Sequence, residues 1–116
     1  MGSLADLQED VAPAEVAALH ERGEIELVDV REPYEWEAGR IEGARHVEMS
    51  RLTEAAGSFD QERPLVFYCR TGSRSAVVTQ AFRASGFKAY NMSGGLVAWT
   101  GQDLPLEPED GSIAKH

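Results

Sequence analysis

A chain of 116 residues has room for one domain with a single hydrophobic core, so we expect no second domain. Its 20 acidic residues exceed its 11 lysines and arginines and give a formal net charge of −9, which argues against nucleic acid as a partner. The single cysteine excludes an intrachain disulfide and a cysteine-based zinc site, and we expect neither a metal nor another cofactor.

The first ten residues contain neither a basic region nor an apolar stretch of the kind that forms a signal peptide. No apolar run reaches the roughly 18 residues that a membrane span needs. We therefore expect a cytoplasmic protein that does not associate with membranes.

The apolar pattern predicts an alternation of helices and strands along the chain. We expect helices over 13–22, 34–39, 49–56, 75–85 and from residue 94 onward, strands over 25–30, 41–47, 65–68 and 88–92, and a frayed tail near the end. Such alternation is typical of an α/β fold, here a central parallel sheet of four to five strands with helices on both faces. The domain spans 1–116, with its core over about 8–105 and its tail over 106–116.

The lone cysteine, Cys69, follows the apolar strand 65–68 and precedes the helix that Gly86 is expected to end. Ligands of parallel sheets bind at the carboxyl ends of the strands, which is where Cys69 lies. The free amides at the start of the next helix favour an anion, and Arg70 and Arg74 add positive charge. Gly72 permits a tight turn with positive φ. We therefore expect a thiol that ionises below its ordinary pKa of about 8.5 and is open to solvent.

A cysteine after four apolar residues is more often an inert core residue, because a free thiol packs as a small hydrophobe. The arginines, the glycine and the hydroxyl groups of Thr71, Ser73 and Ser75 reverse that interpretation for Cys69. For other polar residues we adopt a structural rather than a catalytic interpretation. Asp29 and Arg31 are interpreted as a structural pair at the end of a strand.

The aromatic residues Tyr34, Trp36, Tyr68 and Trp99 are interpreted as core or pocket-wall residues. The three histidines are too scattered to form a metal site, and His46 alone could lie near the pocket.

Three segments, in this order, resemble the signatures of the rhodanese family. Leu27 to Val47 resembles the amino-terminal signature, Cys69-Arg-Thr-Gly-Ser-Arg-Ser75 the active-site loop, and Asn91 to Trp99 the carboxy-terminal signature. The resemblance extends from about Gln8 to Pro105.

The resemblance implies a sulfurtransferase that moves a sulfane sulfur from thiosulfate or a similar donor to cyanide or a thiol. Cys69 would be the catalytic residue and would carry the sulfur as a persulfide. The amides of Arg70, Thr71, Gly72, Ser73 and Arg74 would surround the outer sulfur, and the side chain of Arg70 or Arg74 would hold the anionic end of the donor. Because the chain has no second cysteine, the acceptor is external, either a small molecule or a sulfur-accepting protein.

Two other functions remain open. A cysteine phosphatase or arsenate reductase also uses a cysteine and an arginine on one loop, although such enzymes have five residues between the two and this chain has the four from Arg70 to Ser73. A non-catalytic rhodanese-like module that binds a partner protein is the second alternative, although the cysteine and the loop are both retained.

Overall fold

The computed structural model describes residues 8–116, which fold around a sheet of five strands. The strands are β1 (Asp10–Val11), β2 (Glu26–Asp29), β3 (Arg45–His46), β4 (Leu65–Tyr68) and β5 (Ala89–Met92). All neighbouring pairs are parallel, and the order across the sheet is β1-β5-β4-β2-β3. The predicted α/β fold with a parallel sheet is therefore confirmed. The prediction about a signal peptide falls largely on residues 1–7, outside the described part of the chain.

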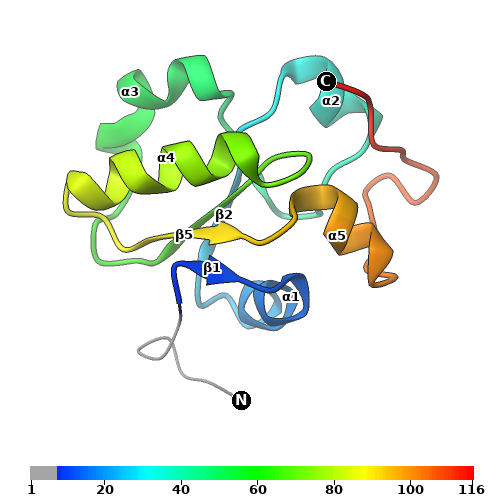
Figure 1. Cartoon of the computed structure of the whole chain (residues 1–116), viewed down its shortest axis with the longest axis horizontal. Helices are drawn as coiled ribbons and strands as arrows, with labels where there is room; N and C mark the ends of the chain where they lie inside the picture. The colour runs from blue at the N-terminus through cyan, green and yellow to red at the C-terminus, as the bar shows by residue number, and fades with distance from the viewer. Residues whose placement is uncertain (1–7) are drawn as a thin grey trace.

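Helices cover both faces of the sheet (Figure 1). They are α1 (Pro13–Glu21), α2 (Pro33–Ala38), α3 (Leu52–Ala55), α4 (Ser73–Ala84) and α5 (Gly95–Gly101), with 3-10 turns over Met49–Arg51 and Ala56–Ser58. In Figure 1, α3 and α4 lie on one side of the sheet and α1 on the other, where α5 packs against it. None of the helices within residues 8–116 combines the length and apolar character needed to cross a bilayer.

The alternation of side chains along β4 divides the core into two layers. Leu65, Phe67 and Cys69 belong to the cluster beneath α4, whereas Val66 and Tyr68 belong to the cluster that contains α1 and α5. All five are fully buried, as expected for a central strand of a parallel sheet. The direction of Cys69 is therefore fixed by the period of two along the strand, which points its side chain toward α4.

The order of the strands changes direction beside Cys69. The chain leaves β2 toward β3 at one edge of the sheet, and it leaves β4 toward β5 on the opposite side. In open parallel sheets, ligands bind between such neighbours, at the carboxyl ends of the strands. Here those ends are Asp29 of β2 and Tyr68 of β4, which are paired in register.

Several predicted boundaries differ from the structure. Helix α4 begins at Ser73 rather than Ser75, so Ser73 and Arg74 lie in its first turn. The predicted strand over 41–47 is reduced to Arg45–His46, and the helix over 49–56 contains only four α-helical residues between two 3-10 turns. The short strand β1 was missed, because two residues show no periodicity and its pairing with β5 comes from the far end of the chain.

The prediction of a frayed tail was wrong. Arg40 and Glu107 exchange backbone hydrogen bonds over 3.0 and 2.7 Å, and the amide of Ser112 donates to Ala38 over 2.8 Å. The hydroxyl of Tyr34 donates to the carbonyl of Lys115, so the last residues lie against α2, as Figure 1 shows. The charged composition of the tail suggested solvation, but its backbone groups find partners at the end of α2.

Candidate active site

Cys69 is the first residue of a loop that lies over the first turn of α5. The amides of Leu96 and Val97 donate to the carbonyls of Cys69 and Arg70 over 2.9 and 3.0 Å. These donors belong to the first turn of α5, whose amides have no acceptor within the helix. The loop backbone is thus held by hydrogen bonds from a neighbouring helix.

The loop directs hydrogen-bond donors at the sulfur. The amide of Gly72 donates to Cys69 Sγ over 3.1 Å, and the φ of +97° at Gly72 makes this turn accessible without strain. Burial raises the pKa of Cys69, whereas hydrogen bonds from the hydroxyl and amide of Ser75 and from the amides of Gly72 and Thr71 lower it. The net pKa lies below the ordinary value for cysteine. The thiol is therefore easier to ionise than one buried among apolar groups alone.

The expectation that the thiol is open to solvent was wrong. Cys69 is 0% exposed, because its side chain points with Phe67 into the layer beneath α4. Thr71 and Ser73 on the same loop are exposed, and Arg70 and Arg74 are partly so. A reagent therefore reaches Sγ only after neighbouring groups shift.

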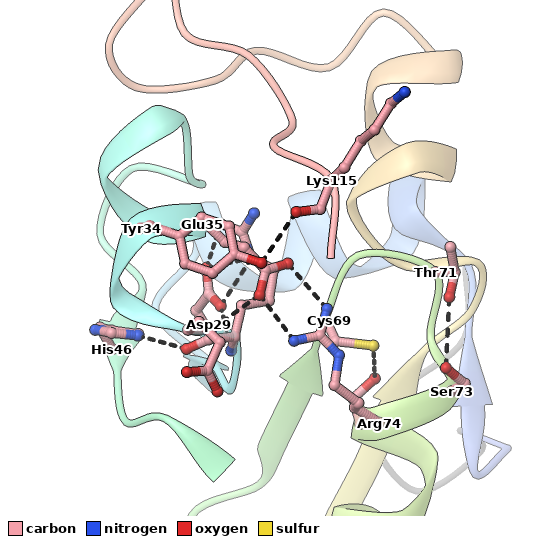
Figure 2. Close-up of polar contacts among 12 residues, drawn as sticks. Asp29, Tyr34, Glu35, His46, Cys69, Thr71, Ser73, Arg74 and Lys115 are labelled. Atoms are coloured by element: carbon pink, nitrogen blue, oxygen red, sulfur yellow. Dashed lines mark hydrogen bonds and ion pairs between the residues drawn. The ribbon is translucent and has the colours of Figure 1, made fainter.

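The two arginines of the loop have different surroundings. Arg74 donates through Nη1 and Nη2 to the two carboxylate oxygens of Glu35, each over 2.9 Å. Figure 2 shows its side chain reaching from α4 past Cys69 toward α2. Arg70 has no such partner within residues 8–116, and its Nε is buried there without a hydrogen bond. From the sequence, both arginines were equal candidates for binding an anion. The structure favours Arg70, because the guanidinium of Arg74 is already paired with Glu35.

The remaining residues of the predicted binding loop contribute mainly through their backbone. The hydroxyls of Thr71 and Ser73 lie 3.5 Å apart and are both exposed. The amide of Thr71 contributes to the lowered pKa of the thiol, and Gly72 is the buried turn residue. Of the amides of residues 70–74, that of Gly72 makes a hydrogen bond to Sγ, so the nest formed by all five amides stays a prediction.

Asp29 and Arg31 form the structural pair that the sequence indicated. Arg31 donates to both carboxylate oxygens of Asp29 and, through Nη2, to the carbonyl of Gly39 over 2.7 Å. Both side chains are fully buried. Trp99 and Tyr68 are core residues, as predicted, whereas Tyr34 is 52% exposed. Nε2 of His46 donates a hydrogen bond to the carbonyl of Arg31 over 2.7 Å, and the ring stacks on Trp36.

Two residues that the sequence did not single out contact the loop. Glu35 binds Arg74, and Asn91 contacts both Ser75 and the carbonyl of Gly72. Glu35 lies within the amino-terminal signature and Asn91 begins the carboxy-terminal one, which was the available signal. A sequence cannot show that a glutamate on a short helix is 0% exposed, because burial there depends on the partner arginine.

Comparison with known proteins agrees with this geometry. A model of the rhodanese-like domain matches residues 12–102. YtwF of Bacillus subtilis, which is named provisionally as a sulfurtransferase, is 36% identical over 100 residues, covering 83% of this chain and 97% of that protein. The thiosulfate sulfurtransferase GlpE of Pseudomonas aeruginosa is 31% identical over 97 residues, covering 83% and 87%. A rhodanese-like domain protein from Staphylococcus aureus, solved as a crystal structure, is 26% identical with a TM-score of 0.75, covering 93% and 100%.

The fold and site define an α/β domain with a cysteine at the carboxyl end of a central parallel strand, in a loop that leads into a helix. The chain belongs to the rhodanese-like domain family. The names of its relatives support a function of the sulfurtransferase type.

Proposed function

We propose that the protein transfers a sulfane sulfur from thiosulfate or a similar anionic donor to cyanide or a thiol, through a persulfide on Cys69. The observation that carries this proposal is the 3.1 Å hydrogen bond from the Gly72 amide to Cys69 Sγ, within a loop whose other donors also lower the pKa of the thiol. A thiolate is the nucleophile that the reaction needs, and main-chain donors suit a sulfur anion.

In the first step the Cys69 thiolate attacks the outer sulfur of thiosulfate. The bond between the two sulfur atoms of the donor breaks, sulfite leaves with the electron pair, and a Cys69 persulfide forms. Arg70 is the cation that we assign to the anionic end of the donor, because its Nε is buried without a partner among the described residues. The amides of the loop then stabilise the charge on the outer sulfur.

In the second step the acceptor attacks the outer sulfur of the persulfide. Cyanide leaves as thiocyanate, whereas a thiolate leaves as a persulfide, and in both cases Cys69 returns as a thiolate. The two half-reactions predict ping-pong kinetics. No second cysteine is available to receive the sulfur within the chain, so the acceptor is an external small molecule or a sulfur-accepting protein. A reducing compartment such as the cytoplasm would keep Cys69 available as a thiol.

Intact mass spectrometry tests the first step directly. Incubation with thiosulfate is expected to add the mass of one sulfur atom to the parent and nothing to Cys69→Ser, and cyanide is expected to remove it with release of thiocyanate. An unchanged mass of the parent would contradict the persulfide step and would favour the non-catalytic binding module. The burial of the thiol is compatible with that alternative, so this experiment tests it as well.

The same protein preparation also tests the alternative function of a cysteine phosphatase. Arg74, the residue that would have to bind a phosphate, is paired with Glu35, which makes phosphate hydrolysis the weaker candidate. Release of phosphate from an aryl phosphate, without any formation of thiocyanate from thiosulfate and cyanide, would overturn our choice.

A further inference from the structure

The ion pair between Glu35 and Arg74 links α2 to the first turn of α4. Two parallel contacts of 2.9 Å join the guanidinium to the carboxylate, and Glu35 is 0% exposed whereas Arg74 is 18% exposed. Paired, bidentate contacts of this kind are the strong form of the interaction, and burial reduces their screening by solvent.

The carboxylate of Glu35 is held in place from its own helix. Its Oε1 accepts the amide of Glu32 over 3.0 Å, which completes a capping box at the start of α2. Burial raises the pKa of Glu35, but the hydrogen bonds from Arg74 and Glu32 and the charges of Arg74 and Arg31 lower it below its ordinary value. Glu35 therefore carries its charge at neutral pH.

The other charges near the loop are few within the described part of the chain. Arg31 is neutralised by Asp29, and α5 beneath the loop has no ionisable side chain. On β5 the neutral Asn91 faces the loop, and Asp10 of β1 stands behind it at 3.1 Å. Figure 2 shows the side chain of Arg74 beside Cys69, and a thiolate at Cys69 raises the pKa of Arg74 in addition to the larger effect of Glu35. The net charge that Cys69 experiences thus depends on how completely Glu35 compensates Arg74.

We propose that Glu35 is a positioning residue that determines the donor specificity of the Cys69 site, because it holds Arg74 against α2 and cancels its charge, leaving Arg70 as the cation that meets the donor. This assignment rests on the proposed function for its link to sulfur donors. Its physical consequence is a loop with one effective positive charge, which suits donors of low negative charge such as small persulfides. A loop with two free arginines would favour the dianion thiosulfate more strongly.

The variant Glu35→Gln keeps the shape of the side chain and an oxygen for the Glu32 amide, but it removes the charge. We expect the pKa of Cys69, measured from the pH dependence of its alkylation rate, to fall by about one unit because Arg74 is no longer compensated. We also expect a several-fold lower KM for thiosulfate with little change in kcat. The matched control is Glu37→Gln, which removes the same charge from an exposed position of α2 and is expected to change neither quantity.

The double variant Glu35→Gln, Arg74→Gln replaces the ion pair by two neutral amides and avoids an unpaired buried charge. If Glu35 cancels Arg74, the pKa of Cys69 in this variant stays close to that of the parent. A rise of about one unit or more would show that Arg74 acts on the thiol uncompensated and would overturn the proposal. A Glu35→Gln variant whose Cys69 pKa equals that of Glu37→Gln would overturn it as well.

The alkylation rate reports the thiol whether or not sulfur transfer occurs, so the two proposals fail separately. If the pKa shifts as expected while thiosulfate adds no sulfur, the electrostatic role of Glu35 stands and the proposed function fails. If sulfur is added but the pKa does not respond to Glu35→Gln, the proposed function stands and the role of Glu35 is refuted.

Discussion

The hydroxyl of Ser75 lies 2.6 Å from Oδ1 of Asn91, whereas it lies 3.5 Å from the sulfur of Cys69. The orientation of Asn91 is fixed because its Nδ2 donates to Asp10 and to the carbonyl of Gly72 over 3.1 and 3.3 Å. Its Oδ1 is therefore an acceptor, and it competes with the sulfur and with the carbonyl of Gly72, 3.3 Å away, for the single proton of the hydroxyl. The hydroxyl of Ser75 therefore lowers the pKa of the thiol against the competition of Asn91, and the amide of Gly72 is a second donor to the sulfur.

This relationship predicts opposite effects for two neighbouring substitutions. Ser75→Ala is expected to raise the pKa of Cys69, because it removes a hydroxyl donor that lowers this pKa even though Oδ1 of Asn91 is a competing acceptor for its proton. Asn91→Leu removes that acceptor and frees the hydroxyl to donate to the sulfur, so the pKa of Cys69 is expected to fall. The pH dependence of alkylation measures both. A Ser75→Ala variant whose thiol pKa equals that of the parent would show instead that the hydroxyl proton stays with Asn91 and does not reach the sulfur.

The lowered pKa of Cys69 also predicts how stability changes with pH. A group whose pKa is lower in the folded than in the unfolded chain stabilises the fold when it is ionised, and this contribution is lost as pH falls through the folded-state pKa. We therefore expect the free energy of unfolding of the parent, relative to Cys69→Ser, to increase with pH up to about 8.5, the pKa of a free thiol. The full increase is about 1.4 kcal/mol for every tenfold difference between the acidity constants of the folded and unfolded thiol. Urea unfolding at a series of pH values measures this difference. A difference that does not vary with pH would mean that the folded protein does not lower the pKa of the thiol.

The sequence predicted the position of Cys69 well, because a strand of four apolar residues and the helix after it are local patterns. The turn at Gly72 was predicted from the sequence as well, since a backbone φ of +97° favours glycine. The burial of the thiol was not predicted, because it depends on which layer the side chain of Cys69 enters, and that follows from the register of β4 against its neighbours.

Local sequence patterns also could not predict which residues contact the Cys69 loop. Glu35 and Asn91 meet the loop only after α2 and β5 pack beside it, and the pairing of Glu35 with Arg74 joins residues 39 positions apart. Two arginines on one loop looked alike in the sequence, and only packing distinguishes Arg74, which is paired with Glu35, from Arg70. Long-range contacts thus set the charge of a site whose position is fixed locally.

The buried pair of Asp29 and Arg31 predicts a strong response to the loss of one partner. Arg31→Met leaves the Asp29 carboxylate buried without its counter-ion, and we expect a loss of about 3–5 kcal/mol in the free energy of unfolding. The double variant Asp29→Leu, Arg31→Met removes both charges and is expected to recover most of that loss. Urea unfolding of the parent, the single variant and the double variant measures the coupling. Equal losses in the single and double variants would mean that the ion pair is not what the single variant destroys.

Gly95 and Gly23 offer a matched test of how α5 holds the Cys69 loop. Both have positive φ, +61° and +71°, so alanine strains the backbone at either position by about 1–2 kcal/mol. At Gly23 an added Cβ meets none of the described residues within 4 Å, whereas at Gly95 it would lie 2.6 Å from the carbonyl oxygens of both Cys69 and Arg70. The loop backbone has to move away, so we expect Gly95→Ala to cost about 2 kcal/mol more than Gly23→Ala in urea unfolding.

The movement of the loop backbone in Gly95→Ala also affects the hydrogen bonds to the Cys69 thiol. It weakens the hydrogen bonds from α5 to the carbonyls of Cys69 and Arg70 and turns the Gly72 amide away from Sγ. The alkylation profile of Gly95→Ala is therefore expected to shift toward that of a free cysteine, whereas Gly23→Ala keeps the profile of the parent. If the two variants lose equal stability and keep the same profile, the first turn of α5 does not hold the loop, and the donors to the sulfur must be maintained by the loop itself.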